Sequence, residues 1–468
     1  MSCQSDNKKA ETDTASKPVQ LVTLDPGHFH AALVQKTMYD NVDSVVYVYA
    51  PEGDDLNFHL GRINGYNSRK DSPTNWKEKI YVGPDFFEKL IADRKAIPPA
   101  RLSHSGGDDL VARRNVVVLS GNNGKKTEYI LDALKAGFDV FADKPMAITT
   151  EDFELLKEAF GIAKEKGLLL YDIMTERFEI NTILQKEISM IPEIFGELEK
   201  GSPDNPAISK ESVHHFYKYV SGSILTRPAW FMDVNQQGEG IVDVMTHLVD
   251  LVQWECFPEQ VIDTKDISFN TAKRWPTDMR LSEFRAITKL DRFPSYLDKY
   301  IINDSVLQVH CNGEINYTIR GVHARTSVIW NYKAPEGTGD THHSIMRGTK
   351  ANLVINQGKE ENYQPTLYIE PISNNPFNPT EAFNKIQTQY PGVELKEMKL
   401  SHGNSGHSKW QVIIPDKYKE GHEAHFGRVM EKFLEYLENK NMPAWEIPNM
   451  LTKYYTTTRA LEIALKKK

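Results

Sequence analysis

The sequence has few cysteines, no long apolar run and almost no clustering of basic residues. Its 468 residues include three cysteines, none of them at the spacing of a metal site, and Cys256 and Cys311 are expected as buried thiols or as a single disulfide. No stretch approaches the roughly 18 consecutive apolar residues of a membrane-spanning helix. Lysine and arginine form no run before the last three residues, and the net charge is -8. These absences argue against a membrane span and against a nucleic-acid partner.

The first 17 residues are polar and have nothing to bury, so we expect 1–17 to be a disordered tether. Cys3 stands ahead of this polar tract, and the arrangement resembles the mature end of a bacterial lipoprotein. The expected location is therefore the periplasm or an outer membrane, with a lipid anchor on Cys3. An ordinary frayed tail of a cytoplasmic protein is the alternative.

The length of the chain predicts two domains, because 468 residues are too many for one ordinary core. Short apolar runs alternate with amphipathic helical stretches from Val19 to Ile173. This alternation predicts an α/β, doubly wound parallel sheet of the Rossmann type at 18–174. Strand-forming runs return from Ser305 to Tyr332, where Asn312-Gly313 is a hairpin signal.

The first apolar run ends at a turn that departs from the usual dinucleotide-binding pattern. That pattern, G-x-G-x-x-G, places a diphosphate at the N-terminus of the following helix. Here Asp25, Gly27 and His30 occupy the three glycine positions, so the middle glycine alone is kept. Gly27 lets the backbone approach a phosphate closely, whereas a carboxylate at Asp25 repels a phosphate unless it points away. An acid about 20 residues further on commonly accepts the ribose hydroxyls, and Glu52 is the nearest candidate.

Two later strands end at polar residues. The strand Val116 to Leu119 leads into a turn that contains Asn122, and the strand Phe138 to Ala142 leads directly into Asp143-Lys144-Pro145. Ligands of open α/β sheets bind at the carboxyl ends of the strands. We therefore expect Lys144 to lie where the chemistry takes place.

The stretch from Gly238 to Asp250 predicts a helix that carries Asp243, His247 and Asp250 on one face. A carboxylate one turn from an imidazole fixes its tautomer and raises its basicity, as a general base near neutral pH requires. The alternative is a buried helix whose polar residues bond to one another inside the protein.

Three motifs together resemble the glucose-fructose oxidoreductase, inositol dehydrogenase and rhizopine-catabolism family (Gfo/Idh/MocA). The stretch 115–147, NVVVLSGNNGKKTEYILDALKAGFDVFADKPMA, is similar to the family's strand, helix, strand and E-K-P motif. The stretch 175–178, TERF, resembles its first strand beyond the nucleotide domain. The stretch 238–250, GEGIVDVMTHLVD, resembles its G-G-x-x-x-D-x-x-x-H-x-x-D helix.

The resemblance implies roles for matching residues. Lys144 stands where the family's lysine contacts both the nicotinamide cofactor and the substrate hydroxyl, Asp243 where it has a substrate-binding acid, and His247 where it has the catalytic base. Asp143 replaces a glutamate, and Lys126 stands about where a histidine is usual. The resemblance also implies an α+β domain at 175–468 with a large open, mainly antiparallel sheet, C-terminal helices that return toward the first domain, and a homo-oligomer formed through the sheet face.

The leading hypothesis is an NAD- or NADP-dependent oxidoreductase acting on a secondary hydroxyl of a sugar, glycoside or polyol. The residues expected to bind the cofactor are Gly27, His28, Phe29, Glu52, Asn122, Asp143 and Lys144. The residues expected to bind the carbohydrate are Arg177, Trp230, Asp243 and His247. Three alternatives stay open: an NAD-retaining glycosidase, a metal-dependent sugar lyase or hydrolase with His28 and His30 as ligands, and a non-catalytic sugar-binding lipoprotein.

Overall fold

The computed structural model describes residues 18–94, 102–104, 107–109, 113–220, 223–303, 305–336, 338–372, 377–399 and 408–466. The expected tether at 1–17, with Cys3, lies outside the described residues, so the lipid anchor stays a prediction. None of the helices in the described part of the chain is long and apolar enough to cross a membrane. Cys256 and Cys311 are free thiols, so of the two expected arrangements the disulfide is wrong.

The first domain is built on a six-stranded parallel sheet with the strand order β3-β2-β1-β6-β7-β8. Its strands are β1 Val19–Leu24, β2 Val45–Ala50, β3 Lys77–Val82, β6 Arg114–Leu119, β7 Asp139–Asp143 and β8 Leu170–Ile173. Its helices are α1 His30–Leu33, α2 Asp54–Ser68, α3 Phe86–Asp93, α4 Lys126–Lys135 and α5 Thr150–Lys166. Every residue of β1 and β7 is buried, as expected of parallel strands covered by helices on both faces. The predicted doubly wound sheet is confirmed.

The second domain is built on a ten-stranded, mostly antiparallel sheet, as expected. Among its described strand pairs, β9 and β15 alone run parallel. Its strands are β9 Ile208–Tyr217, β12 Ile267–Arg280, β13 Ile301–Ile302, β14 Val306–Ile319, β15 Val322–Lys333, β16 Thr341–Arg347, β17 Ala351–Asn356, β18 Thr366–Pro371, β19 Glu394–Lys399 and β20 Ser408–Ile413. Two short hairpins lie apart from both sheets: β4 Leu102–His104 with β5 Gly107–Asp109, and β10 Tyr219–Val220 with β11 Ser223–Ile224. The homo-oligomer expected through the sheet face stays a prediction.

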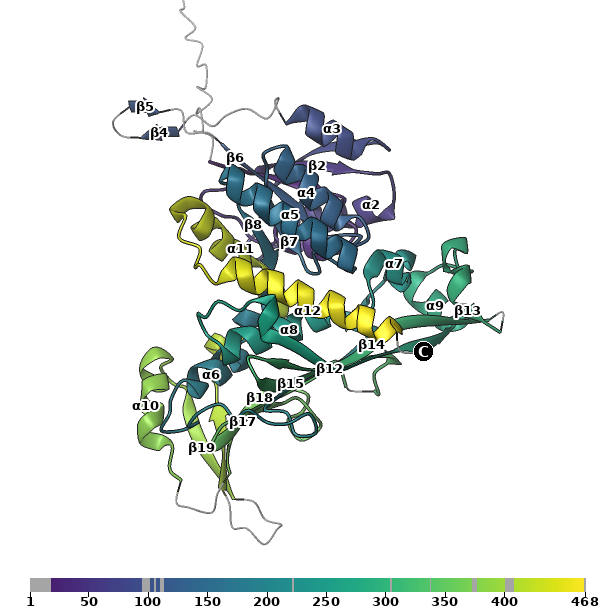
Figure 1. Cartoon of the computed structure of the whole chain (residues 1–468). Helices are drawn as coiled ribbons and strands as arrows, with labels where there is room; N and C mark the ends of the chain where they lie inside the picture. The colour runs from purple at the N-terminus through teal and green to yellow at the C-terminus, as the bar shows by residue number, and fades with distance from the viewer. Residues whose placement is uncertain are drawn as a thin grey trace, which may run out of the picture.

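The last two helices connect the domains (Figure 1). Helix α11, His422–Asn439, buries Phe426, Met430 and Phe433 in the core of the first domain. Helix α12, Glu446–Lys466, lies between the domains and contacts α5 on one side and α8 and β12 on the other. The remaining helices of the second domain are α6 Ile180–Ser189, α7 Val234–Gln237, α8 Met245–Cys256, α9 Leu281–Thr288 and α10 Thr380–Gln389.

The hairpin predicted at Asn312-Gly313 is wrong, because both residues lie inside β14. The side chain of Asn312 is buried and donates to the carbonyl oxygen of Trp275 at 3.1 Å. Packing requires glycine at position 313, because a Cβ there would lie 2.3 Å from the side chain of Ile241. The chain turns instead after Ile319, at two residues with φ of 51° and 77°.

The helix predicted for 238–250 begins later than expected, at Met245. The preceding residues form a turn that is pressed against β14. A Cβ at Gly240 would lie 1.9 Å from the carbonyl oxygen of Cys311, so this close approach requires glycine. Asp243 therefore precedes α8, while His247 lies in its first turn.

Candidate active site at the junction of the domains

Lys144 and Asp243 form an ion pair that joins the two domains. Lys144 follows the carboxyl end of β7, and its Nζ lies 2.7 Å from Oδ1 of Asp243. The other carboxylate oxygen of Asp243 accepts from Nε2 of Gln237 at 3.0 Å. Burial alone would raise the pKa of Asp243, but Lys144 and Gln237 bring it below its usual value. Asp243 is thus ionised at neutral pH, and it holds the ammonium group of Lys144 at the end of the parallel sheet.

The imidazole ring of His247 makes no hydrogen bond to any described residue. Its Nδ1 is buried without a partner, which leaves Nε2 as the ring nitrogen for the cavity that His247 lines. Burial and the charge of Lys144 lower the pKa of His247 to about 3, so the imidazole is neutral at physiological pH. The expectation that Asp243 orients His247 and raises its basicity is wrong, because the carboxylate of Asp243 is already bonded to Lys144 and Gln237.

Glu176 supplies the carboxylate that acts on His247, and sequence reasoning missed it. The motif Thr175–Phe178 forms a 3-10 turn rather than the expected strand. Oε1 of Glu176 lies 3.4 Å from Nε2 of His422 on α11. Burial would raise the pKa of Glu176, but His422 and His247 bring it well below its usual value. Its negative charge in turn raises the pKa of His247, which limits the effect of burial and Lys144.

A cavity of about 650 Å³ lies between this cluster and the open sheet. Histidines and carboxylates of the second domain line it, two of the histidines from α11, together with an apolar wall from β20. The spacing of the histidines at 342, 422 and 425 does not mark them as site residues in the sequence. The charged and titratable residues that line the cavity are Glu176, Glu179, His214, His247, Asp340, His342, Lys419, Glu420, His422 and His425.

Backbone N–H groups of the turn after β1 already donate hydrogen bonds within the protein. The amide of Gly27 donates to the carbonyl oxygen of Asp25 at 2.8 Å, and the amide of His28 donates to the carbonyl oxygen of Ser120 at 3.1 Å. Asp25 adopts a positive φ of 47°. A Cβ at Gly121 would lie 2.2 Å from the carbonyl oxygen of Asp25, so glycine is needed where the β1 and β6 turns cross.

His28, His30 and Asp143 form a buried cluster below this turn. Nδ1 of His30 lies 2.8 Å from Oδ2 of Asp143, and Nδ1 of His28 lies 4.0 Å from the same oxygen. Ser120 Oγ also donates to this oxygen, at 2.9 Å, and Lys126 Nζ donates to the carbonyl oxygen of Asp143, at 2.9 Å. Burial lowers the pKa of both histidines, so both rings are neutral. Two neutral imidazoles and a carboxylate are a donor set that metals accept, and their nearest atoms lie within 4.8 Å of one another.

Other predicted site residues lie apart from the substrate cavity. Trp230 donates from Nε1 to Oδ2 of Asp55 at 2.9 Å and covers Gly27, so it lies on the cofactor side. The side-chain amide of Asn122 donates to Gln236 at 2.7 Å. Glu52 lines a separate cavity of about 470 Å³ at the ends of β1 and β2.

Arg177, which we expected to bind substrate, lies in a buried ion network instead. Its guanidinium makes two hydrogen bonds of 2.7 Å to Asp250 and further bonds to Glu446 at 3.1 and 3.2 Å. Lys453 on α12 contacts Asp250 at 2.9 Å and Asp172 at 2.6 Å. The network joins α12 to both domains, and Arg177 does not line the cavity beside His247.

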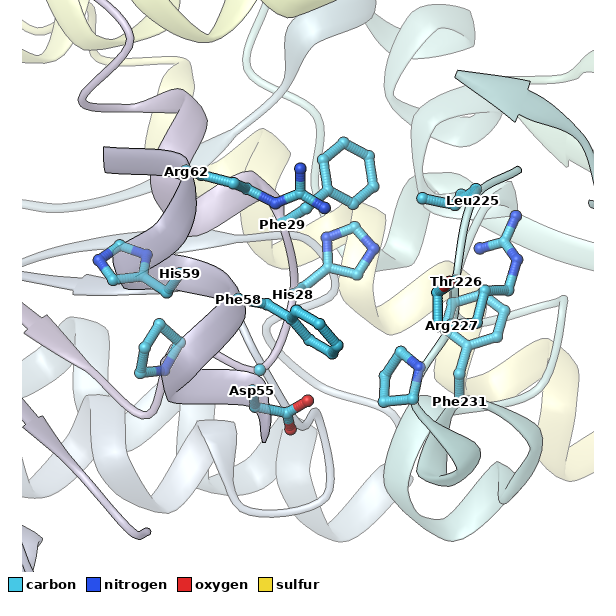
Figure 2. A pocket seen from close by; sticks show the side chains of 13 residues that line it. His28, Phe29, Asp55, Phe58, His59, Arg62, Leu225, Thr226, Arg227 and Phe231 are labelled. Atoms are coloured by element: carbon cyan, nitrogen blue, oxygen red, sulfur yellow. The ribbon is translucent and has the colours of Figure 1, made fainter. Parts of the chain in front are cut away.

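The groove beside β1 has the features that a dinucleotide requires. A cavity at the strand ends continues into a smaller one beside Gly27, His28 and Phe29, and the two share Pro26, Asp55, Phe58, Thr226, Arg227 and Pro228 (Figure 2). Arg62 and Arg227 line the smaller cavity, and neither has an ion-pair partner in the described part of the chain. Gly27 at the turn, the two arginines and the adjoining cavity at the strand ends suit a nicotinamide dinucleotide. The fold and site thus define a dinucleotide-dependent oxidoreductase.

Comparison with known families agrees with this class. Residues 184–465 match the family described as "Putative oxidoreductase C terminal domain". Residues 99–171 match the family described as "Oxidoreductase family, NAD-binding Rossmann fold". The chain belongs to the oxidoreductases of the Gfo/Idh/MocA type, and its cofactor is NAD or NADP. This membership confirms the resemblance that the three motifs indicated. It also argues against the alternative of a non-catalytic sugar-binding lipoprotein.

Solved structures show the same architecture. A protein described as a "putative oxidoreductase" from Parabacteroides merdae is 52% identical, with a TM-score of 0.87, over 97% of this chain and 99% of that chain. A 3-ketoreductase from Actinomadura kijaniata, crystallised with NADP and TDP-benzene, is 14% identical, with a TM-score of 0.52, over 94% of this chain and 96% of that chain. GenD2 from gentamicin A biosynthesis, in complex with NAD, is 12% identical, with a TM-score of 0.53, over 97% of this chain and 95% of that chain. No curated protein matches the chain.

Proposed function

We propose that this protein is an NAD(P)-dependent dehydrogenase that acts on a secondary hydroxyl of a sugar, glycoside or polyol. The observation that carries the proposal is the Lys144–Asp243 pair at the end of β7, beside a neutral His247 that lines a large cavity with both polar and apolar walls. Polar side chains from several elements line this cavity, as recognition of a ligand with several hydroxyl groups requires. The neighbouring 3-ketoreductase with TDP-benzene gives a precedent for a sugar-related ligand on this fold.

Each side chain of the site has a separate role in the proposed oxidation of an alcohol. The nicotinamide ring supplies the hydride acceptor when the cofactor is bound. Lys144 Nζ donates a hydrogen bond to the substrate oxygen and stabilises the charge that develops there, while Asp243 keeps the ammonium group in place. His247 Nε2 takes the hydroxyl proton as the hydride leaves the same carbon.

Glu176 stabilises the imidazolium that this step creates, because its carboxylate faces His247 across the cavity. His422, in contact with Glu176 and with its side chain 48% exposed, then connects the buried proton to solvent. The expected proton path therefore runs from His247 past Glu176 to His422.

Replacement of Lys144 by methionine tests the proposal. We expect kcat to fall about a thousandfold, because the donor to the developing oxyanion is lost. The control is Lys157→Met, which removes an ammonium group whose side chain is 46% exposed on α5. Lys157→Met should keep the wild-type melting temperature, whereas Lys144→Met should lower it, because Asp243 loses its partner in a buried ion pair. Circular dichroism should show that both variants are folded at the assay temperature. Wild-type turnover by the folded Lys144→Met variant would refute the assignment.

A glycosidase that retains its cofactor is a second candidate. It would oxidise a glycoside to the ketone, eliminate the substituent, add water to the resulting double bond and return the hydride to the ketone, so the cofactor would never need to leave. The hydrogen bond between Trp230 and Asp55 favours this candidate, since it closes the two domains over the Gly27 turn and would slow cofactor exchange. Glycoside cleavage without net formation of reduced cofactor would identify the glycosidase, whereas stoichiometric reduced cofactor would identify the dehydrogenase.

A further inference from the structure

We propose that Arg62 and Arg227 clamp the diphosphate of the dinucleotide between the two domains. The inference rests on the proposed function, and it assigns to two side chains the charge neutralisation that a glycine-rich turn and its helix usually supply. Arg62 comes from α2 of the first domain, and Arg227 from the segment that precedes α7 in the second domain. Figure 2 shows them on either side of His28.

The β1 turn of this chain is a poor anion site on its own. The amides of Gly27 and His28, which would point at a phosphate in a glycine-rich turn, already donate to carbonyl oxygens. Helix α1 has four residues, too few for a useful dipole at its N-terminus. Asp25 and Asp55 add carboxylates beside the turn. A diphosphate bound here needs positive charge from elsewhere.

Arg62 is a cation without a partner that reaches into this pocket. It has no hydrogen bond and no ion pair with any described residue, and its Cζ lies 5.6 Å from the ring centre of Phe29. In Figure 2 its guanidinium extends from α2 across Phe29 toward His28. A half-buried arginine that stacks on an aromatic ring is held in one orientation, with its N–H groups free for an anion.

Arg227 is a more deeply buried cation, also without a carboxylate partner within ion-pair distance in the described structure. It is 5% exposed, and its Nε and Nη2 donate to the carbonyl oxygens of Phe216 and His215 at 3.0 and 3.3 Å. Its guanidinium lies 4.6 Å from the ring centre of Phe231 and 5.3 Å from that of Trp330. Burial lowers the pKa of Arg227 to about 10, so the group stays charged at neutral pH.

Asp340 and Asp243 raise the pKa of Arg227 from beyond ion-pair distance, but no carboxylate contacts it. A buried charge without a counter-ion in contact is costly, and an anion that binds next to it recovers part of that cost. Arg227 is close enough to His28 for its charge to lower the pKa of that histidine, which places the cation beside the β1 turn. The adjoining cavity of about 470 Å³ extends along Glu52 and Asp54, where the nucleoside part of the cofactor has room. One ligand can therefore reach both arginines and both domains.

Calorimetric titration of the full-length protein with ADP, NAD⁺, NADP⁺, adenosine and inorganic phosphate tests the clamp. We expect Arg62→Gln to raise the Kd for ADP and for the dinucleotide at least tenfold and to leave the Kd for adenosine unchanged. Arg227→Gln should have the same selective effect, and Arg62→Lys should recover part of the affinity. Arg285→Gln is the control, because it removes an exposed arginine that pairs with Asp291.

The possible results separate the clamp from the function. Wild-type ADP affinity in folded Arg62→Gln and Arg227→Gln would overturn the clamp and leave the dehydrogenase intact. An equal loss of adenosine and ADP binding would mean that the arginines support the pocket structurally, and this would also overturn it. Competition by phosphate that is lost in Arg62→Gln would support it. If the wild type binds neither dinucleotide nor ADP, the proposed function itself fails.

Discussion

Two sites lie at the carboxyl edge of the same parallel sheet, and they handle charge in opposite ways. At the end of β7, Lys144 meets the carboxylate of Asp243 directly, so each buried charge has its partner inside the protein. At the end of β1, the donors of the turn bond to neighbouring carbonyl oxygens, and neither arginine that lines the pocket forms an ion pair with a described carboxylate, although Asp55 lines the same pocket. The first site is complete without a ligand, whereas the arginines of the second are not held by an ion pair. The difference indicates that the β7 site positions its own groups and that the β1 site is completed by an anion.

Substitutions at the β7 site are expected to have the largest effect, and this effect should be on kcat because they change the chemical step. His247→Ala should reduce kcat by about a hundredfold or more, because the proton acceptor is lost. Glu176→Gln should reduce kcat about tenfold, since the charge that raises the pKa of His247 is lost. Neither change should alter the Kd for NAD(P), which calorimetry measures independently of turnover.

Glu420→Gln is the matched control for Glu176→Gln, since it removes another carboxylate from the wall of the same cavity. Glu420 is paired with Arg428 rather than with a histidine, so its loss should leave kcat within about twofold of the wild type. An equal loss of kcat in both variants would show a general effect of cavity charge and would contradict the specific role of Glu176.

Sequence reasoning predicted the fold because the fold depends on local patterns. Apolar strands separated by amphipathic helices predicted the parallel sheet, and the rule that ligands bind at strand ends brought attention to Lys144. The altered turn at Asp25, Gly27 and His30 was also visible in the sequence. These features can be recognised from the sequence alone because each depends on residues within about one helix or strand of one another.

The relations that failed to show in the sequence depend on contacts between distant segments. The sequence around Glu176 does not indicate that α11 places His422 within ion-pair distance of it. It also does not indicate that Arg177 forms ion pairs with Asp250 and Glu446. The i,i+4 spacing of Asp243 and His247 predicted a pair on one helix face. The close approach of Gly240 to β14 delays the helix and turns Asp243 toward Lys144 instead.

A medium effect is expected at the β1 site, in the pH dependence of cofactor affinity. Burial, and then the charge of Asp55, raise the pKa of Asp25 to about 6, while Lys125 opposes them. Asp25 therefore gains its negative charge as the pH rises through about 6, and this charge repels the diphosphate. We expect the Kd for NAD(P) to increase several-fold between pH 5 and pH 7.5. In Asp25→Asn, which tolerates the positive φ, the increase should be largely absent.

The Asp25 prediction also has a clear contrary outcome. Because Lys144 and Asp243 are already paired, kcat at saturating substrate should not share this pH dependence. A Kd that is flat with pH in the wild type would mean that Asp25 points away from the bound anion.

The smallest effect is expected from removal of metal ions. His28, His30 and Asp143 have suitable donor atoms, but Asp143 Oδ2 already accepts from Ser120 and contacts His30. The ammonium groups of Lys126 and Lys144 also act on this cluster, and their positive charge opposes a bound cation. Dialysis against a chelator should leave dehydrogenase activity unchanged, and elemental analysis should find less than about 0.1 zinc per chain. Loss of activity that added zinc restores would establish the cluster as a metal site.

The central claim is that this chain binds a nicotinamide dinucleotide at its altered β1 turn. The most direct measurement is to denature the purified protein and to identify the released nucleotide by chromatography and absorbance, followed by calorimetric titration of the refolded or stripped protein with NAD⁺ and NADP⁺. The account predicts a released dinucleotide at near-stoichiometric amount, or saturable binding of one of the two when it is added back. A folded protein that releases no nucleotide and binds neither dinucleotide would contradict it.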